Sequence, residues 1–127
     1  MSNRHEYREK IIFVLYQHLL LDKDLETCFN DNFEESEFDD FLLEIRNDLI
    51  ANKNDYIAEI SNYLNKWKFE RLNLIEQAIL LLATSESKLK LNDKAIIINE
   101  AINIAKEYCD EDAYKYINGV LDNICKN

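Results

Sequence analysis

Two segments in the last third of the chain place polar side chains inside apolar helical stripes. They are Ile98-Asn99-Glu100-Ala101 and Tyr116-Ile117-Asn118-Gly119-Val120-Leu121. An amide or carboxylate in such a stripe can hydrogen-bond a neighbouring helix or a ligand. Gly119 is the only glycine in the chain. Because glycine in a helix interior costs roughly 1 kcal/mol relative to alanine, we expect another backbone to pack against it where the last two helices cross.

Side chains able to make or break bonds do not form a catalytic pattern. The two histidines, His5 and His18, both lie near the start, and the chain has no glycine-rich phosphate loop, no nucleophile elbow and no Glu-x-x-His pair. Cys28, Cys109 and Cys125 are widely spaced, which favours reduced thiols over a disulfide framework or a structural zinc. We therefore expect a binding protein that is not an enzyme and has no metal or cofactor.

Composition indicates an all-α protein. The chain has 127 residues, no proline, and 47% hydrophobic residues, whereas strands and tight turns need Gly and Pro punctuation. A chain of this length forms one domain that buries about two-thirds of its unfolded surface. No apolar run approaches the ~18 residues needed to span a bilayer, and the start lacks a signal core. We expect a soluble, cytoplasmic protein.

Acidic residues are concentrated in one segment. Residues 22–44 hold ten acids and one lysine, for a charge of −9 within a total of −10. Such a segment repels phosphate and attracts basic partners. For any single acid, a solvated surface role is the alternative.

Apolar residues at helical spacing predict roughly six helices with short connections. The first helix runs from about Asn3 to Leu21, and the second starts near Ser36. The third follows a break at Asn52 and Asn54 and reaches Trp67, and the fourth begins at Asn73. The fifth is capped by Asn92 and Asp93, and the sixth follows a break at 108–110. Residues 22–35 are expected to form a polar connection, with room for a short helical turn at Leu25, Cys28 and Phe29. The run 78–83 is apolar on nearly every face, so the fourth helix should be the most buried. We predict two packed three-helix subdomains, residues 1–66 and 67–127.

Four short motifs follow one another along the chain. They are Arg8-Glu9 with Leu15-Tyr16, then Trp67 and Arg71-Leu72 with residues 75–80, then Asn99-Glu100-Ala101, and finally Asn118-Gly119-Val120-Leu121. In this order and spacing they resemble the NusB family of bacterial transcription antitermination factors. The resemblance implies a NusB-like fold of two three-helix subdomains and no catalytic activity.

The same resemblance implies a function. NusB proteins pair with a basic small-subunit ribosomal protein, known in this role as NusE, and the pair binds the boxA element of nascent ribosomal RNA transcripts. That complex joins other Nus factors on RNA polymerase and suppresses premature termination.

Six residues match positions that the resemblance associates with RNA. They are Arg4, His5 and Arg8 on the first helix and Lys115, Tyr116 and Asn118 on the sixth. Arginine can contact phosphates, an aromatic ring can stack an unpaired base, and asparagine can bond a base edge. A solvated helix start is the alternative for the arginines, and a structural role is the alternative for Tyr116 and Asn118.

Three residues match positions that face the ribosomal partner: Tyr16, Glu70 and Glu76. Because that partner is basic, acids here would supply complementary charge. Glu76 is also placed to cap a helix. Asn99 and Glu100 are expected to bridge the fifth and fourth helices.

Three departures from the family pattern keep alternatives open. Leu81 replaces a frequent arginine, Ser85 a tyrosine, and Cys109 a helix-ending glycine. A protein-interaction module without RNA binding is one rival. A NusB-like domain of a ribosomal RNA methyltransferase is another, and it is disfavoured because no glycine-rich cofactor loop is present. A homodimer is left open.

Overall fold

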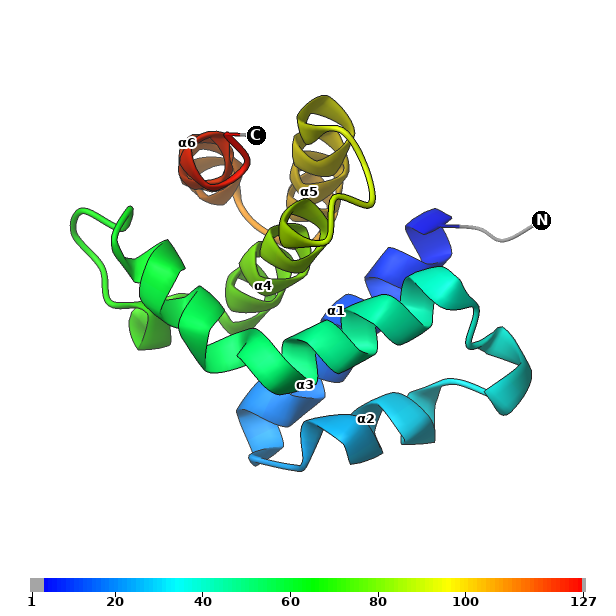
Figure 1. Ribbon diagram of the computed structural model, residues 1–127. Coiled ribbons are helices and arrows are strands. Elements are labelled where there is room, and N and C mark those ends of the chain that lie inside the picture. The colour runs from blue at the N-terminus through cyan, green and yellow to red at the C-terminus, as the bar shows by residue number, and fades with distance from the viewer. Residues whose placement is uncertain (1–3, 127) are drawn as a thin grey trace.

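The computed structural model describes residues 4–126, which form α-helices and two short 3₁₀ turns with no strand (Figure 1). The elements are α1 (Arg4–Leu21), α2 (Leu25–Asn32), η1 (Glu35–Glu37), α3 (Asp40–Ser61), η2 (Phe69–Arg71), α4 (Leu74–Lys88), α5 (Lys94–Tyr108) and α6 (Glu111–Ile124). The all-α prediction is confirmed. No helix within these residues combines the length and the apolar composition that a bilayer crossing demands.

Helix α4 lies at the centre of the fold. Every residue from Gln77 to Glu86 is buried, and α4 packs against α1, α3, α5 and α6. Figure 1 shows it between the three helices that precede it and the two that follow. The prediction that this helix is the most buried one is confirmed. Its continuous apolar run leaves no face for solvent, so all other long helices can use it as a common core surface.

The middle of the chain differs from the sequence prediction. Residues 40–61 form one continuous helix, α3, through the expected break at Asn52 and Asn54. The Asn52 amide donates to Asp48 Oδ1 at 2.9 Å, one turn earlier, so asparagine here bonds within the helix instead of ending it. Trp67, expected on a helix, lies in the loop before η2. Asn3, where the first helix is expected to begin, falls outside the described residues.

Several acids of segment 22–44 begin helices. Asp24 caps α2, which occupies part of the expected polar connection, and accepts a hydrogen bond from the Thr27 backbone at 3.0 Å. This bond and one from the Thr27 hydroxyl lower the pKa of Asp24. Asp39 caps α3 by accepting from the Leu42 backbone at 2.9 Å. Carboxylates favour helix starts because they satisfy free backbone N–H groups and oppose the positive end of the dipole.

A buried ion pair ties the start of α1 to the end of α4. Arg8 and Glu86 are 5% and 2% exposed. The Arg8 guanidinium donates from Nη2 to Glu86 Oε1 at 2.8 Å and from Nε to Glu86 Oε2 at 2.9 Å. This two-pronged geometry is the one that makes arginine and carboxylate a strong pair. The arginine expected to contact RNA is therefore enclosed in the core.

Two further elements complete the surroundings of Arg8. Its Nη1 donates to Glu100 of α5 at 3.2 Å, and its Cζ lies 5.6 Å from the centre of the Phe41 ring of α3. Burial by itself would lower the pKa of Arg8, but the hydrogen bonds and charges of Glu86 and Glu100 raise it overall. Glu100 therefore bridges α5 to α1, and the expected bridge from α5 to α4 through it is wrong.

The three residues that differ from the family pattern fit their surroundings in the fold. Leu81 is fully buried within α4. Ser85, also buried, donates its hydroxyl to Asp48 Oδ2 of α3 at 2.7 Å. Cys109 ends α5 with φ −127° and ψ 169°, an extended conformation open to any residue, so the position does not require the glycine that is usual there.

Gly119 does not mark a helix crossing. It is exposed on α6, and a Cβ added to it would meet no atom within 4 Å. Helix α6 instead packs through Ile117 and Leu121, both fully buried. The expectation of a close backbone contact at Gly119 is wrong, because the buried stripe of α6 runs along another side of the helix.

Removing Glu86 should strongly destabilise the fold, because Arg8 would remain buried with only Glu100 beside it. We expect Glu86→Ala to lower the free energy of unfolding by about 3 kcal/mol or more, measured by urea denaturation. The control Glu59→Ala removes the exposed pair with Lys88 and should cost less than about 1 kcal/mol. The double variant Arg8→Met/Glu86→Leu should retain more stability than Glu86→Ala. Equal losses in Glu86→Ala and Glu59→Ala would contradict the role of the pair.

Gly119→Ala should stabilise the protein, because the added methyl group meets open space and alanine favours helix. The expected gain is roughly 0.5–1 kcal/mol, measured by the same denaturation. A loss of stability would show that the backbone does pack closely at this position.

Two candidate interfaces beside the last helix

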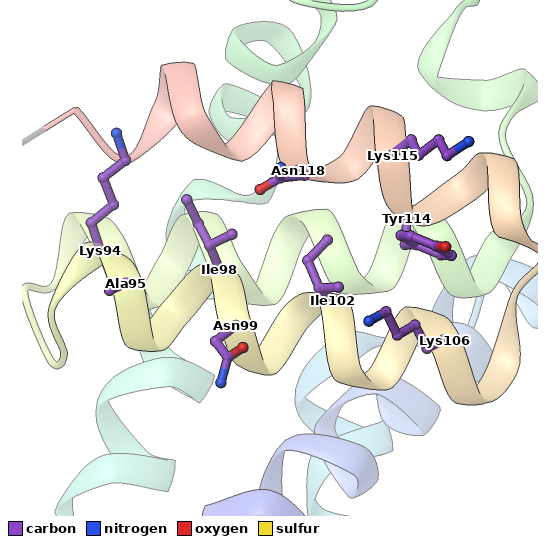
Figure 2. Close-up of a pocket in the computed structure, with 9 residues that line it drawn as sticks. All are labelled: Lys94, Ala95, Ile98, Asn99, Ile102, Lys106, Tyr114, Lys115 and Asn118. Atoms are coloured by element: carbon purple, nitrogen blue, oxygen red, sulfur yellow. The ribbon is translucent and has the colours of Figure 1, made fainter.

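A groove of about 680 Å³ lies between α5 and α6. Figure 2 shows its lining residues: Lys94, Ala95, Ile98, Asn99, Ile102 and Lys106 from α5, and Tyr114, Lys115 and Asn118 from α6. Lys94 lies at one end and Tyr114, Lys106 and Lys115 lie at the other (Figure 2). The two helices run side by side, so the groove has an apolar floor between positively charged ends.

The charge of this groove is opposite to that of the whole chain. Among the described residues, three lysines and no carboxylate line it, although the chain has a net charge of −10. Lys94 pairs with Asp122 at 2.8 Å, and Lys115 with Glu111 at 3.6 Å. Such exposed pairs contribute little stability and can yield to a competing anion. The groove is therefore a positively charged region that can bind an anionic group.

The predicted residues of α6 do not share one face. Lys115 and Asn118 line the α5–α6 groove, but Tyr116 lines a different groove on the other side of the helix. The aromatic residue that belongs with Lys115 is Tyr114, whose ring centre lies 5.3 Å from Lys106 Nζ. Sequence reasoning missed Tyr114, although helical spacing could have found it. Tyr114 and Asn118 are four residues apart and share a face of the helix, whereas Tyr116 and Asn118 are two apart and do not.

At the start of α1, the three predicted RNA residues share contacts, with Arg4 and Arg8 beside the Phe41 ring and His5 and Arg8 beside Glu100, but they differ in exposure. Arg4 is exposed, with its Cζ 4.0 Å from the centre of the Phe41 ring. His5 is half-buried. Its Nε2 lies 3.6 Å from Glu9 Oε1, and its Nδ1 lies 3.4 Å from Glu100 Oε1. Arg8 is enclosed by its ion pairs and does not present its guanidinium to a phosphate. Of the two arginines, Arg4 alone has a solvent-facing guanidinium.

The second groove, of about 820 Å³, lies between the loop that follows α3 and the outer side of α6. Its lining includes three aromatic residues (Tyr63, Trp67, Tyr116), three acids (Glu76, Asp110, Asp112), two basic residues (Lys66, Arg71) and Gly119. Trp67 is 63% exposed. An exposed tryptophan beside a groove is typical of residues that dominate the energy of protein interfaces.

A hydrogen bond organises the wall of the second groove. The Tyr116 hydroxyl donates to Glu76 Oε1 at 2.7 Å and thereby joins α6 to the first turn of α4. Burial, and then this bond, raise the pKa of Tyr116. Burial beside Glu76 and Asp110 also raises the pKa of the Cys109 thiol to about 11. Asn73 caps α4 by accepting from the Ile75 backbone at 2.8 Å. The bond shown for the Glu76 carboxylate, which was expected to cap this helix, is the one from Tyr116.

The predicted partner residues are placed in three settings. Glu76 lines the second groove, whereas Tyr16 is half-buried on α1 and Glu70 is exposed in η2, and neither lines that groove. Asn99 was expected to bridge helices, but it is exposed and lines the α5–α6 groove. Trp67, predicted on a helix, and Gly119, predicted at a helix crossing, both line the second groove instead.

Within residues 4–126, one group of side chains has the chemistry to hold a metal ion. Ligand atoms of His5, Glu9 and Glu107 lie within 4.8 Å of one another. Glu9 already accepts a hydrogen bond from the Tyr108 hydroxyl at 2.8 Å and lies 3.6 Å from His5. With the contact between His5 and Glu100, these contacts make His5 and Glu9 part of a polar network between α1 and α5.

The model of the NusB family matches residues 5–126. The chain belongs to the NusB family. It is 36% identical to a transcription antitermination protein NusB of Campylobacter hominis, with 99% of this chain and 98% of that protein covered. It is 38% identical to the NusB of Listeria innocua, over 95% and 94% of the two chains.

Solved structures show the same NusB fold. T. maritima NusB superposes with a TM-score of 0.88 at 30% identity, covering 99% of this chain and 92% of that one. A complex of antitermination factors NusB and NusE with double-stranded RNA matches with a TM-score of 0.83 at 24% identity, covering 97% and 96%. The predictions of the family and of its all-helical fold are confirmed.

Proposed function

We propose that this protein is a transcription antitermination factor that binds boxA-type single-stranded RNA in nascent ribosomal RNA transcripts together with NusE, a basic small-subunit ribosomal protein. The observation that carries the proposal is the match to the NusB family over nearly the whole chain, 5–126. The relatives named as antitermination proteins support it. A solved protein of the same fold holds NusE and double-stranded RNA, which supports RNA and NusE as partners in general. Other Nus factors and RNA polymerase are engaged indirectly, in the cytoplasm.

The RNA face in this proposal combines Arg4 and His5 at the start of α1 with Lys115 and Asn118 beside α5. Each lysine or arginine that neutralises a phosphate releases counterions, so affinity falls as salt rises. The acidic segment 22–44 disfavours RNA elsewhere on the chain. Together these features direct the RNA to the few places where positive charge is exposed.

The partner face is the second groove with Glu76 at its wall. Its carboxylates complement a basic ribosomal protein, and the exposed Trp67 offers a large apolar contact. Acidic residues steer a basic partner during encounter and affect the association rate more than the final affinity. Tyr16 and Glu70 extend this face only if the partner also contacts α1 and η2.

The mechanism consists of docking alone. The protein holds RNA and partner at once, so each gains from the local concentration that the other provides. A second candidate is a NusB-like interaction module with weakened RNA binding. The burial of Arg8 favours it, because this burial leaves one solvent-facing arginine in the first two turns of α1.

Titration of a labelled boxA-type RNA, with and without the basic ribosomal protein, separates the two candidates. An antitermination factor should bind boxA more tightly than scrambled RNA, with a negative slope of log affinity against log salt. Fluorescence anisotropy at several salt concentrations is the measurement. If neither condition distinguishes boxA from scrambled RNA, the interaction module is the better description.

Reversing the charge of Glu76 should slow association with the basic ribosomal protein. We expect Glu76→Lys to lower the association rate about tenfold or more at low salt, with a smaller effect at high salt, measured by stopped-flow mixing. Glu44→Lys makes the same change of charge at an exposed site on α3 and should have little effect. Tyr116→Phe removes the hydrogen bond but keeps the carboxylate, so it should associate like wild type. An unchanged rate in Glu76→Lys would exclude this groove.

A further inference from the structure

The α5–α6 groove has features that the proposed function leaves unused. Lys115 and Asn118 were expected from sequence, but Lys94, Lys106 and Tyr114 join them only in the fold. Lys94 and Lys106 are separated by 12 residues of one helix, which corresponds to roughly 18 Å along its axis. A groove of this length exceeds what one small anion needs and suits an extended chain with repeated charge.

We propose that the groove seats an unpaired RNA base on the Tyr114 ring, with Lys106 and Lys115 on the flanking phosphates and Asn118 at the base edge. This inference rests on the proposed RNA binding and names where and how the single strand is held. It assigns the stacking role to Tyr114 and removes it from Tyr116. No bond is made or broken.

The aromatic assignment follows from the position of each hydroxyl and ring. The Tyr116 hydroxyl is bonded to Glu76 at 2.7 Å in the second groove, which places its ring on the other side of α6. Tyr114 lines the α5–α6 groove and has a lysine ammonium 5.3 Å from its ring centre. Because this ammonium lies over the ring face, a stacking base takes its place there and leaves Lys106 for the adjacent phosphate.

Charge complementarity selects RNA as the occupant. Among the described residues, the groove lining carries three positive charges and no negative one. Within residues 4–126, the charged group of Lys106 contacts only the Tyr114 ring. By contrast, Lys94 forms an ion pair with Asp122, and Lys115 forms one with Glu111. The exposed Asn118 amide can donate to and accept from a base edge, which a helical duplex would not offer here.

The test is RNA affinity measured by anisotropy for two variants of the groove. Tyr114→Leu keeps apolar bulk and should weaken single-stranded RNA binding roughly 5- to 150-fold, the effect of one lost stacking contact. Tyr114→Phe should bind like wild type. Phe13→Leu, a matched aromatic-to-leucine change at an exposed position of α1, should bind RNA like wild type.

Lys106→Gln should reduce the slope of log affinity against log salt by about 0.7, one phosphate contact on a single strand. Lys23→Gln changes net charge equally in the acidic segment and should leave the slope unchanged. Urea denaturation of every variant keeps altered folding separate from altered binding.

A set of RNAs, each lacking one base, locates the contact. If a base stacks on Tyr114, one abasic RNA loses affinity for wild type and shows no further loss with Tyr114→Leu. If Tyr114→Leu and Lys106→Gln bind like wild type while wild type still selects boxA RNA, the groove proposal is overturned and the proposed function stands. A paired duplex that competes as well as the single strand also overturns it. If wild type does not select boxA RNA, both proposals fail.

Discussion

The buried ion pair between Arg8 and Glu86 fixes the position of α1 relative to α4. Arg8 stands in the second turn of α1 and reaches Glu86 at the end of α4, Glu100 in the middle of α5 and the ring of Phe41 at the start of α3. A charge removed from water is costly unless its partners are placed well, so this group of side chains tolerates little displacement. Its position fixes how α1 lies against α4 and α5, and hence where Arg4 and His5 meet the surface.

The arrangement of α6 then divides the surface by charge and chemistry. Its inner stripe, with Ile117 and Leu121, enters the core, and the two flanking sides line separate grooves. Lysines and Tyr114 border one groove, and three acids and two basic residues border the other with Tyr116 and Trp67. A protein with a strong negative charge can thus present a positive strip and an acidic, aromatic pocket without either cancelling the other, since the helix separates them.

Much of this fold follows from sequence because local signals agree with burial. The all-round apolar run 78–83 predicts the central helix, and Asn73 predicts where it begins. The break expected at Asn52 and Asn54 is wrong, because asparagine is only weakly unfavourable in helices and packing decides. Helix α2 was not foreseen as a full helix because its eight residues carry a short, mostly polar pattern.

The site was harder to predict than the fold. Matching a motif assigns roles to Lys115, Tyr116 and Asn118 as neighbours in sequence, but a helix turns neighbours onto different sides. Arg8 shows the same limit, because a motif cannot tell an arginine that meets phosphate from one that meets a buried carboxylate. Only the fold brings Glu86, 78 residues away, to its guanidinium.

At the single glycine of the chain, Gly119, helix stability and the depth of the second groove favour different residues. At Gly119 the backbone of α6 itself is the surface of the second groove, since no side chain covers it. A methyl group there would strengthen the helix and make the groove shallower. The contribution of this residue is thus empty volume: it gives up some helix stability and leaves the main chain of α6 open in the wall of the groove.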